Sequence, residues 1–356
     1  MPRVRLDPFA TEVVCADGET ILAAVLRSGY FVRYGCKYGG CGTCRALLVE
    51  GDVRDSGSSF ALPDPARAQG WVLPCSSTPL GDCAIDVSAM ELSEEEFLGG
   101  DTVTTIQASL ASIEDLTPTI YGVTLRLVDP PAISFAAGQF VNVVVPGREN
   151  EAARAFSIAS SPADDSVVEL FVKRLPGGRF AQYLESAPAG AALQLHGPLG
   201  SLRAHPSYRK MIMVAGGSGL APLLSILTDL AQKQDRRAVV LFFGARTLDE
   251  LYHLDRIRRL CETSADLGFV PVVQYPQPGW QGEAGTVTEV VARRMPDLRG
   301  YDAYICGPPP MVTATRDLVL KLGVRLANIY SDSFVPAGGT ARPGQPEPYP
   351  RRFQNS

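Results

Sequence analysis

The sequence predicts a multidomain protein of the α+β and α/β classes, with an antiparallel β-barrel in the middle and a doubly wound parallel domain at the end. Three observations predict it. Six of the eight cysteines fall within the first 95 residues. Short β-rich runs broken by Gly and Pro follow, which is typical of a closed barrel. Beyond residue 209, apolar strands alternate with helices, as in a parallel sheet.

The predicted boundaries follow these changes in pattern. They give a cysteine-rich domain at 1–95, a linker at 96–101, a barrel at 102–208, an α/β domain at 209–335 and a disordered Pro/Gly/Gln-rich tail at 336–356. In the first domain we expect strands at 4–6, 11–14 and 46–50 and a helix at 20–27. The acidic stretch 91–96 with Gly99 and Gly100 is expected to form the linker.

Composition limits the classes of function. No run of eighteen apolar residues occurs, so no transmembrane helix is expected, and the N-terminus lacks the apolar region of a signal peptide. We therefore expect a cytoplasmic protein, in which eight cysteines need an explanation other than disulfides. The net charge of −5 arises within residues 1–95, where eight Lys/Arg face thirteen Asp/Glu. That disfavours nucleic acid as a partner, and leaves either an acidic docking face or a plain solvated surface.

Four cysteines of the first domain have the spacing of an iron–sulfur site. Cys36, Cys41 and Cys44 stand as C-x4-C-x2-C in a glycine-rich stretch, and Cys75 follows thirty residues later. A curled loop that supplies three thiolates, with a fourth from elsewhere, is the plant-type ferredoxin arrangement. Glycines suit this loop because they allow positive φ and turn backbone N–H groups toward the cluster sulfurs. The spacing predicts a [2Fe–2S] cluster on these four metal ligands.

Two other metal sites fit the cysteines less well. A structural zinc site usually uses paired C-x2–4-C units, and only one such pair is present. A Rieske centre needs histidines, and the three histidines, His196, His205 and His253, all lie outside this segment. Cys15 and Cys83 have no partner at ligand spacing and are expected to be small buried hydrophobes.

In the barrel segment, strands are expected near 123–127, 139–145 and 167–172, and one short motif between them carries chemistry. Arg154-Ala155-Phe156-Ser157 offers a guanidinium for a pyrophosphate and a hydroxyl for a flavin ring nitrogen. Lys173, Gly177 and Gly178 follow just before a predicted short helix, whose free N–H groups favour phosphate oxygens. The later turn 196–200, His-Gly-Pro-Leu-Gly, is adequately explained as the end of a barrel strand.

The α/β segment carries two loops that directly follow apolar strands. We expect strands at 211–215, 239–244, 269–274 and 301–306 and helices at 222–232, 248–260, 287–295 and 311–322. Gly216-Gly217-Ser218-Gly219 follows the first strand and precedes a helix that Pro222 opens, a geometry suited to phosphate groups. Cys306 ends the last of these strands, and Gly307 and Pro308 follow it. A buried cysteine at a strand end and a glycine turn without a ligand are the plain structural alternatives.

These motifs resemble the ferredoxin–NADP⁺ reductase superfamily, which has R-x-[YF]-S, G-P-x-G, G-G-[ST]-G-[LI]-[AT]-P and C-G-P-x-x-[ML] at these places. The resemblance implies that FAD lies against 154–157, with Arg154 on the diphosphate and Ser157 on the isoalloxazine. It implies that 216–219 and 306–308 bind the nicotinamide dinucleotide, with Cys306 near the nicotinamide as a packing group. Phe334 stands where the family commonly has a residue close to the flavin face. Ala181 departs from the Ser or Thr that the family often has there.

The order of the three segments resembles the reductases of bacterial soluble di-iron monooxygenases and covers about 335 of the 356 residues. The resemblance implies a β-grasp ferredoxin domain, and a reaction that takes hydride from NADH to FAD and single electrons through the cluster to a hydroxylase. NADH is favoured over NADPH mainly by this resemblance. The sequence adds little, because Arg246, a possible partner for the 2′-phosphate of NADPH, is followed by the acidic Asp249 and Glu250. The alternatives are the reductase of an aromatic-ring dioxygenase or of another iron-dependent enzyme such as a deoxysugar-forming dehydratase. The alternative from a different class is a non-catalytic flavin and iron–sulfur redox-sensing module.

Overall fold

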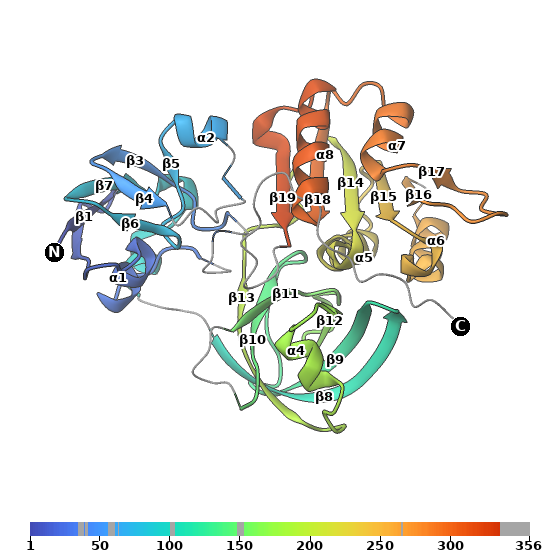
Figure 1. Ribbon diagram of the computed structural model, residues 1–356, viewed down its shortest axis with the longest axis horizontal. Helices are drawn as coiled ribbons and strands as arrows, with labels where there is room; N and C mark the ends of the chain where they lie inside the picture. The colour runs from blue at the N-terminus through green and yellow to red at the C-terminus, as the bar shows by residue number, and fades with distance from the viewer. Residues whose placement is uncertain are drawn as a thin grey trace, which may run out of the picture.

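The computed structural model describes residues 1–34, 39, 42–55, 61–62, 64–99, 104–147, 153–264 and 266–334. Three lobes follow one another along the chain, each built on its own sheet (Figure 1). The expected tail 336–356 lies outside the described residues, as do Cys36 and Cys41. Among the helices of these ranges, none combines the length and the apolar character needed to cross a bilayer.

The first lobe is a mixed sheet with a helix packed on it, a β-grasp arrangement. The sheet order is β2-β1-β7-β3-β5, in which β1 and β7 run parallel and the other neighbours antiparallel. The elements are β1 (Arg3–Asp7), β2 (Thr11–Val14), α1 (Ile21–Arg27), β3 (Ala46–Glu50), β4 (Val53–Asp55), α2 (Asp64–Ala68), β5 (Trp71–Val72), β6 (Ser77–Pro79), β7 (Cys83–Asp86) and the 3₁₀ turn η1 (Ser88–Met90). Thr20 caps α1, since its side chain accepts a hydrogen bond from the Ala23 N–H. Ile21 and Val25 of that helix are fully buried.

The acidic stretch expected to begin the linker forms a helix of the first lobe, α3 (Glu94–Leu98). Ser93 and Glu96 form a reciprocal capping box, and the acidic first turn suits the positive end of the helix dipole. Phe97 is fully buried and stacks on Phe9 and Tyr30, with ring centroids 4.0 and 5.1 Å away. This burial fixes the end of the lobe, which the charge pattern alone did not indicate.

The second lobe is an antiparallel six-stranded barrel with strand order β11-β10-β13-β8-β9-β12. Its elements are β8 (Thr104–Thr117), β9 (Ile120–Asp129), β10 (Phe140–Val144), β11 (Arg154–Ser157), β12 (Val167–Lys173), α4 (Arg179–Leu184) and β13 (Ala192–Leu199). A bridge between Ile158 and Leu170 joins the two outer strands and closes the barrel. Alternate apolar side chains such as Val123, Leu125 and Val141 fill the interior. The expected closed barrel is therefore present.

The third lobe is a parallel sheet of order β17-β16-β15-β14-β18-β19 with helices on both faces. Its elements are β14 (Lys210–Gly216), η2 (Gly217–Gly219), α5 (Leu220–Gln232), β15 (Val239–Ala245), η3 (Leu248–Glu250), α6 (Leu254–Thr263), β16 (Leu267–Val273), β17 (Glu283–Ala284), α7 (Val287–Arg294), β18 (Tyr301–Gly307), α8 (Pro309–Lys321), η4 (Leu326–Asn328) and β19 (Ile329–Ser333). Met211 and Met213 of β14 pack with α5, whereas Ile212 and Val214 pack with α7 and α8. The chain order reverses between β14 and β18, which is where such sheets bind ligands.

One expected helix, 248–260, is broken in the structure. Residues 248–250 form η3, and α6 starts only at Leu254. Between them Tyr252 is buried and its hydroxyl donates a hydrogen bond to the Gly217 carbonyl, 3.0 Å away. His253 adopts a left-handed backbone with φ of 54°. A contact 35 residues distant in sequence overrides the local helical pattern.

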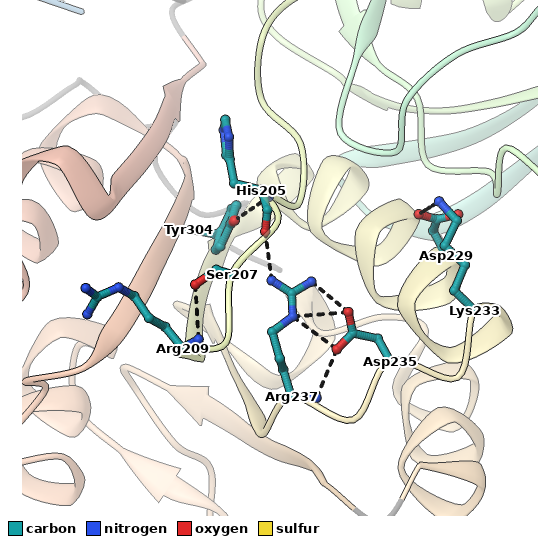
Figure 2. Close-up of polar contacts among 8 residues, drawn as sticks. All are labelled: His205, Ser207, Arg209, Asp229, Lys233, Asp235, Arg237 and Tyr304. Carbon is teal, nitrogen blue, oxygen red and sulfur yellow. Dashed lines mark hydrogen bonds and ion pairs between the residues drawn. The ribbon is translucent and has the colours of Figure 1, made fainter.

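The segment around His205, which joins the barrel to the third lobe, is held against the third lobe by hydrogen bonds (Figure 2). The His205 N–H donates a hydrogen bond to the Tyr304 hydroxyl oxygen at 3.0 Å. Its carbonyl accepts one from Arg237 Nη1 at 2.8 Å, and Asp235 holds the same guanidinium. The His205 ring also stacks on Tyr330 at 4.2 Å between centroids. The connection is thus ordered by side chains of β18, β19 and the loop after α5.

The first and third lobes bring two arginines near each other. Arg45 follows Cys44 directly and lies over the Trp71 ring, 3.9 Å from its centroid. Burial lowers the pKa of the Arg45 guanidinium, and the charge of Arg316 on α8 lowers it further. Burial likewise lowers the pKa of Arg316, opposed by the neighbouring Asp317. Arg45 therefore experiences the like charge of Arg316 where these lobes approach.

Candidate functional site

The described part of the predicted cluster site consists of Cys44 and Cys75. Cys44 precedes β3 and Cys75 lies in the turn after β5; both are buried, neither is in a disulfide, and both belong to one apolar cluster. Gly42, between Cys41 and Cys44, has φ of +73°, and a Cβ there would lie 3.3 Å from the Ala61 Cβ. Only glycine adopts this bend readily. Two buried thiols beside a tightly curled glycine loop fit an iron–sulfur cluster; Cys36 and Cys41 lie outside the described residues.

The predicted flavin motif forms an edge strand of the barrel. In β11, Ala155 lies opposite Asn142 and Ser157 opposite Phe140 of β10, so these four side chains share one face. Phe156 points the other way and packs on Phe180 of the barrel core, with ring centroids 5.2 Å apart. Asn142 and Ser157 are both buried, each only 7% exposed. A buried amide and a buried hydroxyl on one face offer the donors and acceptors that a polar ring such as a flavin needs.

Three of the expected phosphate-binding residues lie around α4. Lys173 ends β12, and Gly177 and Gly178 form the turn before the helix, closed by a hydrogen bond from the Gly178 N–H to the Leu175 carbonyl at 2.8 Å. Arg154, the remaining cation of the motif, starts β11. The departure at Ala181 has a structural reason in this chain. Ala181 is 5% exposed and packs into the barrel core, where a hydroxyl would have to be desolvated.

The two nucleotide loops of the third lobe touch each other. Gly216 ends β14 and Gly217 to Gly219 follow it. Cys306 and Gly307 end the neighbouring β18 and Pro308 follows it, with Ala215 and Cys306 in register. A Cβ on Gly219 would lie 2.2 Å from the Cys306 carbonyl oxygen, so only glycine permits the contact. Ser218 is also buried within this loop. The loops form one surface at the carboxyl edge of the sheet, where a dinucleotide is expected.

Cys306 lies near the end of β18. It is fully buried, and burial raises the pKa of its thiol well above the ordinary value. A neutral thiol cannot act as a thiolate nucleophile, which agrees with the packing role implied by the resemblance. Asp332 of β19 lies in register with Cys306, and burial raises the pKa of this carboxyl to about 7. The next residue but one, Phe334, donates its N–H to the Gly307 carbonyl at 2.8 Å.

Among the described residues, the structure therefore places the predicted ones in four groups. These are Cys44 with Cys75, the β10–β11 face, the turn before α4 with Lys173, and the joined loops with Phe334 beside them. Sequence reasoning missed Tyr252, His253, Asn142 and Asp332, whose significance depends on contacts between distant segments. Only Asn142 carried a signal, since a lone amide within the β-rich run 139–145 needs hydrogen-bond partners wherever it is buried.

Comparison with known proteins identifies all three lobes. The chain matches the family models described as 2Fe-2S iron-sulfur cluster binding domain over residues 4–80, oxidoreductase FAD-binding domain over 107–204 and oxidoreductase NAD-binding domain over 213–317. The predicted iron–sulfur, flavin and nicotinamide domains are thereby confirmed.

Full-length relatives share the same three parts. The chain is 34% identical over 340 residues to the reductase component of propane 2-monooxygenase from Rhodococcus jostii, covering 93% of this chain and 91% of that one. It is 35% identical over 346 residues to the phenol hydroxylase P5 protein of Acinetobacter pittii, covering 95% and 96%. The crystal structure of a cytochrome P450 reductase of Amycolatopsis matches with a TM-score of 0.74 at 30% identity, covering 95% of this chain and 100% of that one. The chain therefore belongs to this family of flavin and iron–sulfur oxidoreductases, the reductase components of multicomponent oxygenases.

Proposed function

We propose that the protein takes hydride from NADH at the third lobe and delivers single electrons through the first lobe to the hydroxylase component of a di-iron monooxygenase. One observation carries the order of the relay. Phe140 of β10 and Leu199 of β13 belong to the same apolar cluster as Cys44 and Cys75, and Ala155 packs against it. The barrel face that bears Ser157 is thus continuous with the lobe that bears the cysteines. Electrons need cross only this contact.

The chain's own residues hold and orient the cofactors. When bound, the flavin accepts two electrons at once and releases them singly, which matches nicotinamide to a one-electron iron–sulfur centre. Arg154 and Lys173 supply cations for the flavin diphosphate, and the Ser157 hydroxyl is placed to donate a hydrogen bond to the ring. Cys306, Gly307 and Pro308 border the nicotinamide position, and Phe334 shields it from water. We further propose Cys36, Cys41, Cys44 and Cys75 as the cluster ligands.

The pairing of Arg246 supports NADH over NADPH. Arg246 follows β15, where a cation would meet the 2′-phosphate of NADPH. Its guanidinium Nη2 lies 3.0 Å from Glu250 Oε1, and its backbone N–H donates to Glu250 Oε2 at 3.0 Å. A carboxylate fixed at this position repels a phosphate. We therefore propose NADH as the physiological reductant.

We propose a di-iron hydroxylase as the partner and the cytoplasm as the setting. Support for an oxygenase partner comes from the similarity to the reductase component of propane 2-monooxygenase and to the phenol hydroxylase P5 protein. The alternative is a different oxygenase, favoured by the similarity to the P450 reductase and to the ferredoxin reductase of carbazole 1,9a-dioxygenase, the latter at 28% identity and a TM-score of 0.68. We propose 102–208 and 209–335 as the limits of the second and third domains. The first domain, expected at 1–95, extends through α3, because Phe97 packs in its core.

The test is an anaerobic titration of the purified protein with NADH and then NADPH, followed by its visible spectrum. We expect NADH at low excess to bleach both the flavin and the iron–sulfur bands. Bleaching by NADPH alone would contradict the choice of nucleotide but keep the relay. Bleaching of flavin without the cluster would contradict the relay, and no response to either nucleotide would favour a non-catalytic redox-sensing module.

A further inference from the structure

The barrel and the third lobe meet along one seam, which the nucleotide chemistry described so far does not use. On the barrel side it is formed by β12 and the segment before it. The Ser225 hydroxyl of α5 donates a hydrogen bond to the Ser160 carbonyl at 2.6 Å. Further along the seam, Arg256 of α6 reaches Glu169 of β12. The two lobes are therefore tied by polar contacts as well as by packing.

Glu169 is the centre of the seam. Arg256 Nη1 lies 2.8 and 3.1 Å from its two carboxylate oxygens, and both side chains are largely buried. His253 Nε2 lies 3.8 Å from Glu169 Oε1, too far for a hydrogen bond, and this nitrogen is buried without a partner among the described residues. The His253 ring packs on Phe171 of β12, with centroids 5.1 Å apart. Barrel residues thus surround His253 on two sides.

Tyr252 connects the barrel to the nucleotide loop, residues 216–219. Its ring meets Phe171 of the barrel and Phe243 of β15 edge to face, at 5.3 and 5.4 Å. It is 4% exposed, and its hydroxyl donates to the Gly217 carbonyl at 3.0 Å. Gly217 itself has φ of +55°. An unbroken set of contacts therefore runs from β12 of the barrel to the middle of the glycine loop.

The backbone between η3 and α6 is not helical, and its conformation permits these contacts. His253 holds a left-handed conformation, which is uncommon for residues other than glycine, although histidine is among the side chains enriched there. This conformation interrupts the helix that the sequence favours and turns Tyr252 inward toward Gly217. A buried tyrosine hydroxyl needs a hydrogen-bond partner, and here the partner is the carbonyl in the middle of the glycine loop.

We infer that Tyr252 and His253, clamped by the Glu169–Arg256 ion pair, are positioning residues that hold the nucleotide loop in register with the flavin barrel. The inference rests on the proposed binding of NADH by that loop. The barrel packs on Tyr252 and His253, and Tyr252 in turn holds the loop. The seam therefore keeps the loop in the conformation that binds the nucleotide, so loosening it should weaken nucleotide binding and raise the KM rather than slow the hydride step.

The first test is Tyr252→Phe, which keeps the ring and removes only the hydroxyl. We expect the KM for NADH in ferricyanide reduction to rise about fivefold, since one buried hydrogen bond is lost, with kcat within about twofold. Bound flavin, read from its absorbance per protein, stays at the level of the unsubstituted protein. An unchanged KM, or a raised KM that merely follows loss of flavin, would overturn the inference.

The second test asks whether the seam acts through Tyr252. We expect Arg256→Met to raise the KM about threefold, and the double variant with Tyr252→Phe to raise it no more than about sixfold. Independent effects would instead multiply to about fifteenfold, which would refute the clamp. Arg256→Lys, which can retain one ion pair, should recover most of the effect of Arg256→Met.

Asp297→Asn is the matched control. It removes an ion pair of the same lobe, with Arg299, but both side chains are exposed and lie before β18, at the edge of the sheet opposite the glycine loop. It should leave the KM unchanged. If the unsubstituted protein fails to oxidise NADH, the proposed function fails; if it turns over normally and the variants match it, only the clamp fails.

Discussion

At the residue scale, the contact between Gly219 and the Cys306 carbonyl joins two motifs that the sequence presents 87 positions apart. Each motif was predictable, because glycine runs and a cysteine after an apolar strand are visible in the sequence. Their contact was not, because it depends on β14 and β18 being neighbours in the sheet. The same holds for Asn142 and Ser157, which share a face only through strand pairing.

Gly219→Ala should disable the nucleotide site. Its Cβ would lie 2.2 Å from the Cys306 carbonyl oxygen and 2.6 Å from the Gly307 Cα, so backbone must move. We expect a loss of stability of about 1–3 kcal/mol and at least tenfold lower NADH oxidation, with the cluster absorbance intact. Gly81→Ala is the control, because no atom lies within 4 Å of the place that its added methyl would take. Normal turnover in Gly219→Ala would show that the loops need not touch.

Asp332 makes a prediction about pH. Burial raises the pKa of its carboxyl to about 7 in the folded protein, above the ordinary 3.8. Protonation therefore favours folding, and this stabilisation is lost as the pH rises through 7. Asp332→Asn should raise the melting temperature at pH 8 and progressively less toward pH 5. Asp297→Asn, whose carboxyl has its pKa lowered to about 2 beside Arg299, should give no such gain. A pH-independent effect of Asp332→Asn would contradict a carboxyl that ionises near pH 7 in the folded protein.

At the element scale, most strands and helices follow their sequence patterns because apolar periodicity reflects burial on one face. The exceptions are informative. Residues 94–98 form a helix because Phe97 packs against the rings of Phe9 and Tyr30. The helix expected at 248–260 is interrupted because the Tyr252 hydroxyl donates a hydrogen bond to the Gly217 carbonyl. Both outcomes depend on tertiary contacts that no local window contains.

A second dependence of stability on pH is expected from His253, which precedes α6. Burial lowers the pKa of His253, opposed by Glu169 and Glu114 and assisted by Arg256. The neutral ring therefore favours folding above the unfolded pKa near 6.5, and the stabilisation is lost as the pH falls. His253→Asn, which keeps a residue tolerant of the left-handed backbone, should lose less melting temperature between pH 8 and 5.5 than the unsubstituted protein. Equal losses in both proteins would argue that this histidine stays charged or exposed.

At the scale of the whole molecule, the relay order predicts separable activities. Cys41→Ser should abolish the iron–sulfur absorbance while NADH-dependent ferricyanide reduction continues at the flavin. Reduction of cytochrome c, which we expect to draw on the cluster, should fall at least tenfold. Cys83→Ser, a buried cysteine outside the proposed ligand set, should keep the cluster. Intact cytochrome c reduction without a cluster would reverse the proposed order.

The like charges of Arg45 and Arg316 imply an unusual response to ionic strength. Dissolved salt normally weakens the docking of charged proteins, because it screens attraction. Here it screens a repulsion inside one molecule, so added NaCl should draw the first and third lobes together. Small-angle X-ray scattering should then show a radius of gyration that shrinks between low salt and physiological salt, and Arg316→Ala should remove the change. Transfer within the chain and delivery to a partner would thus respond to salt in opposite directions.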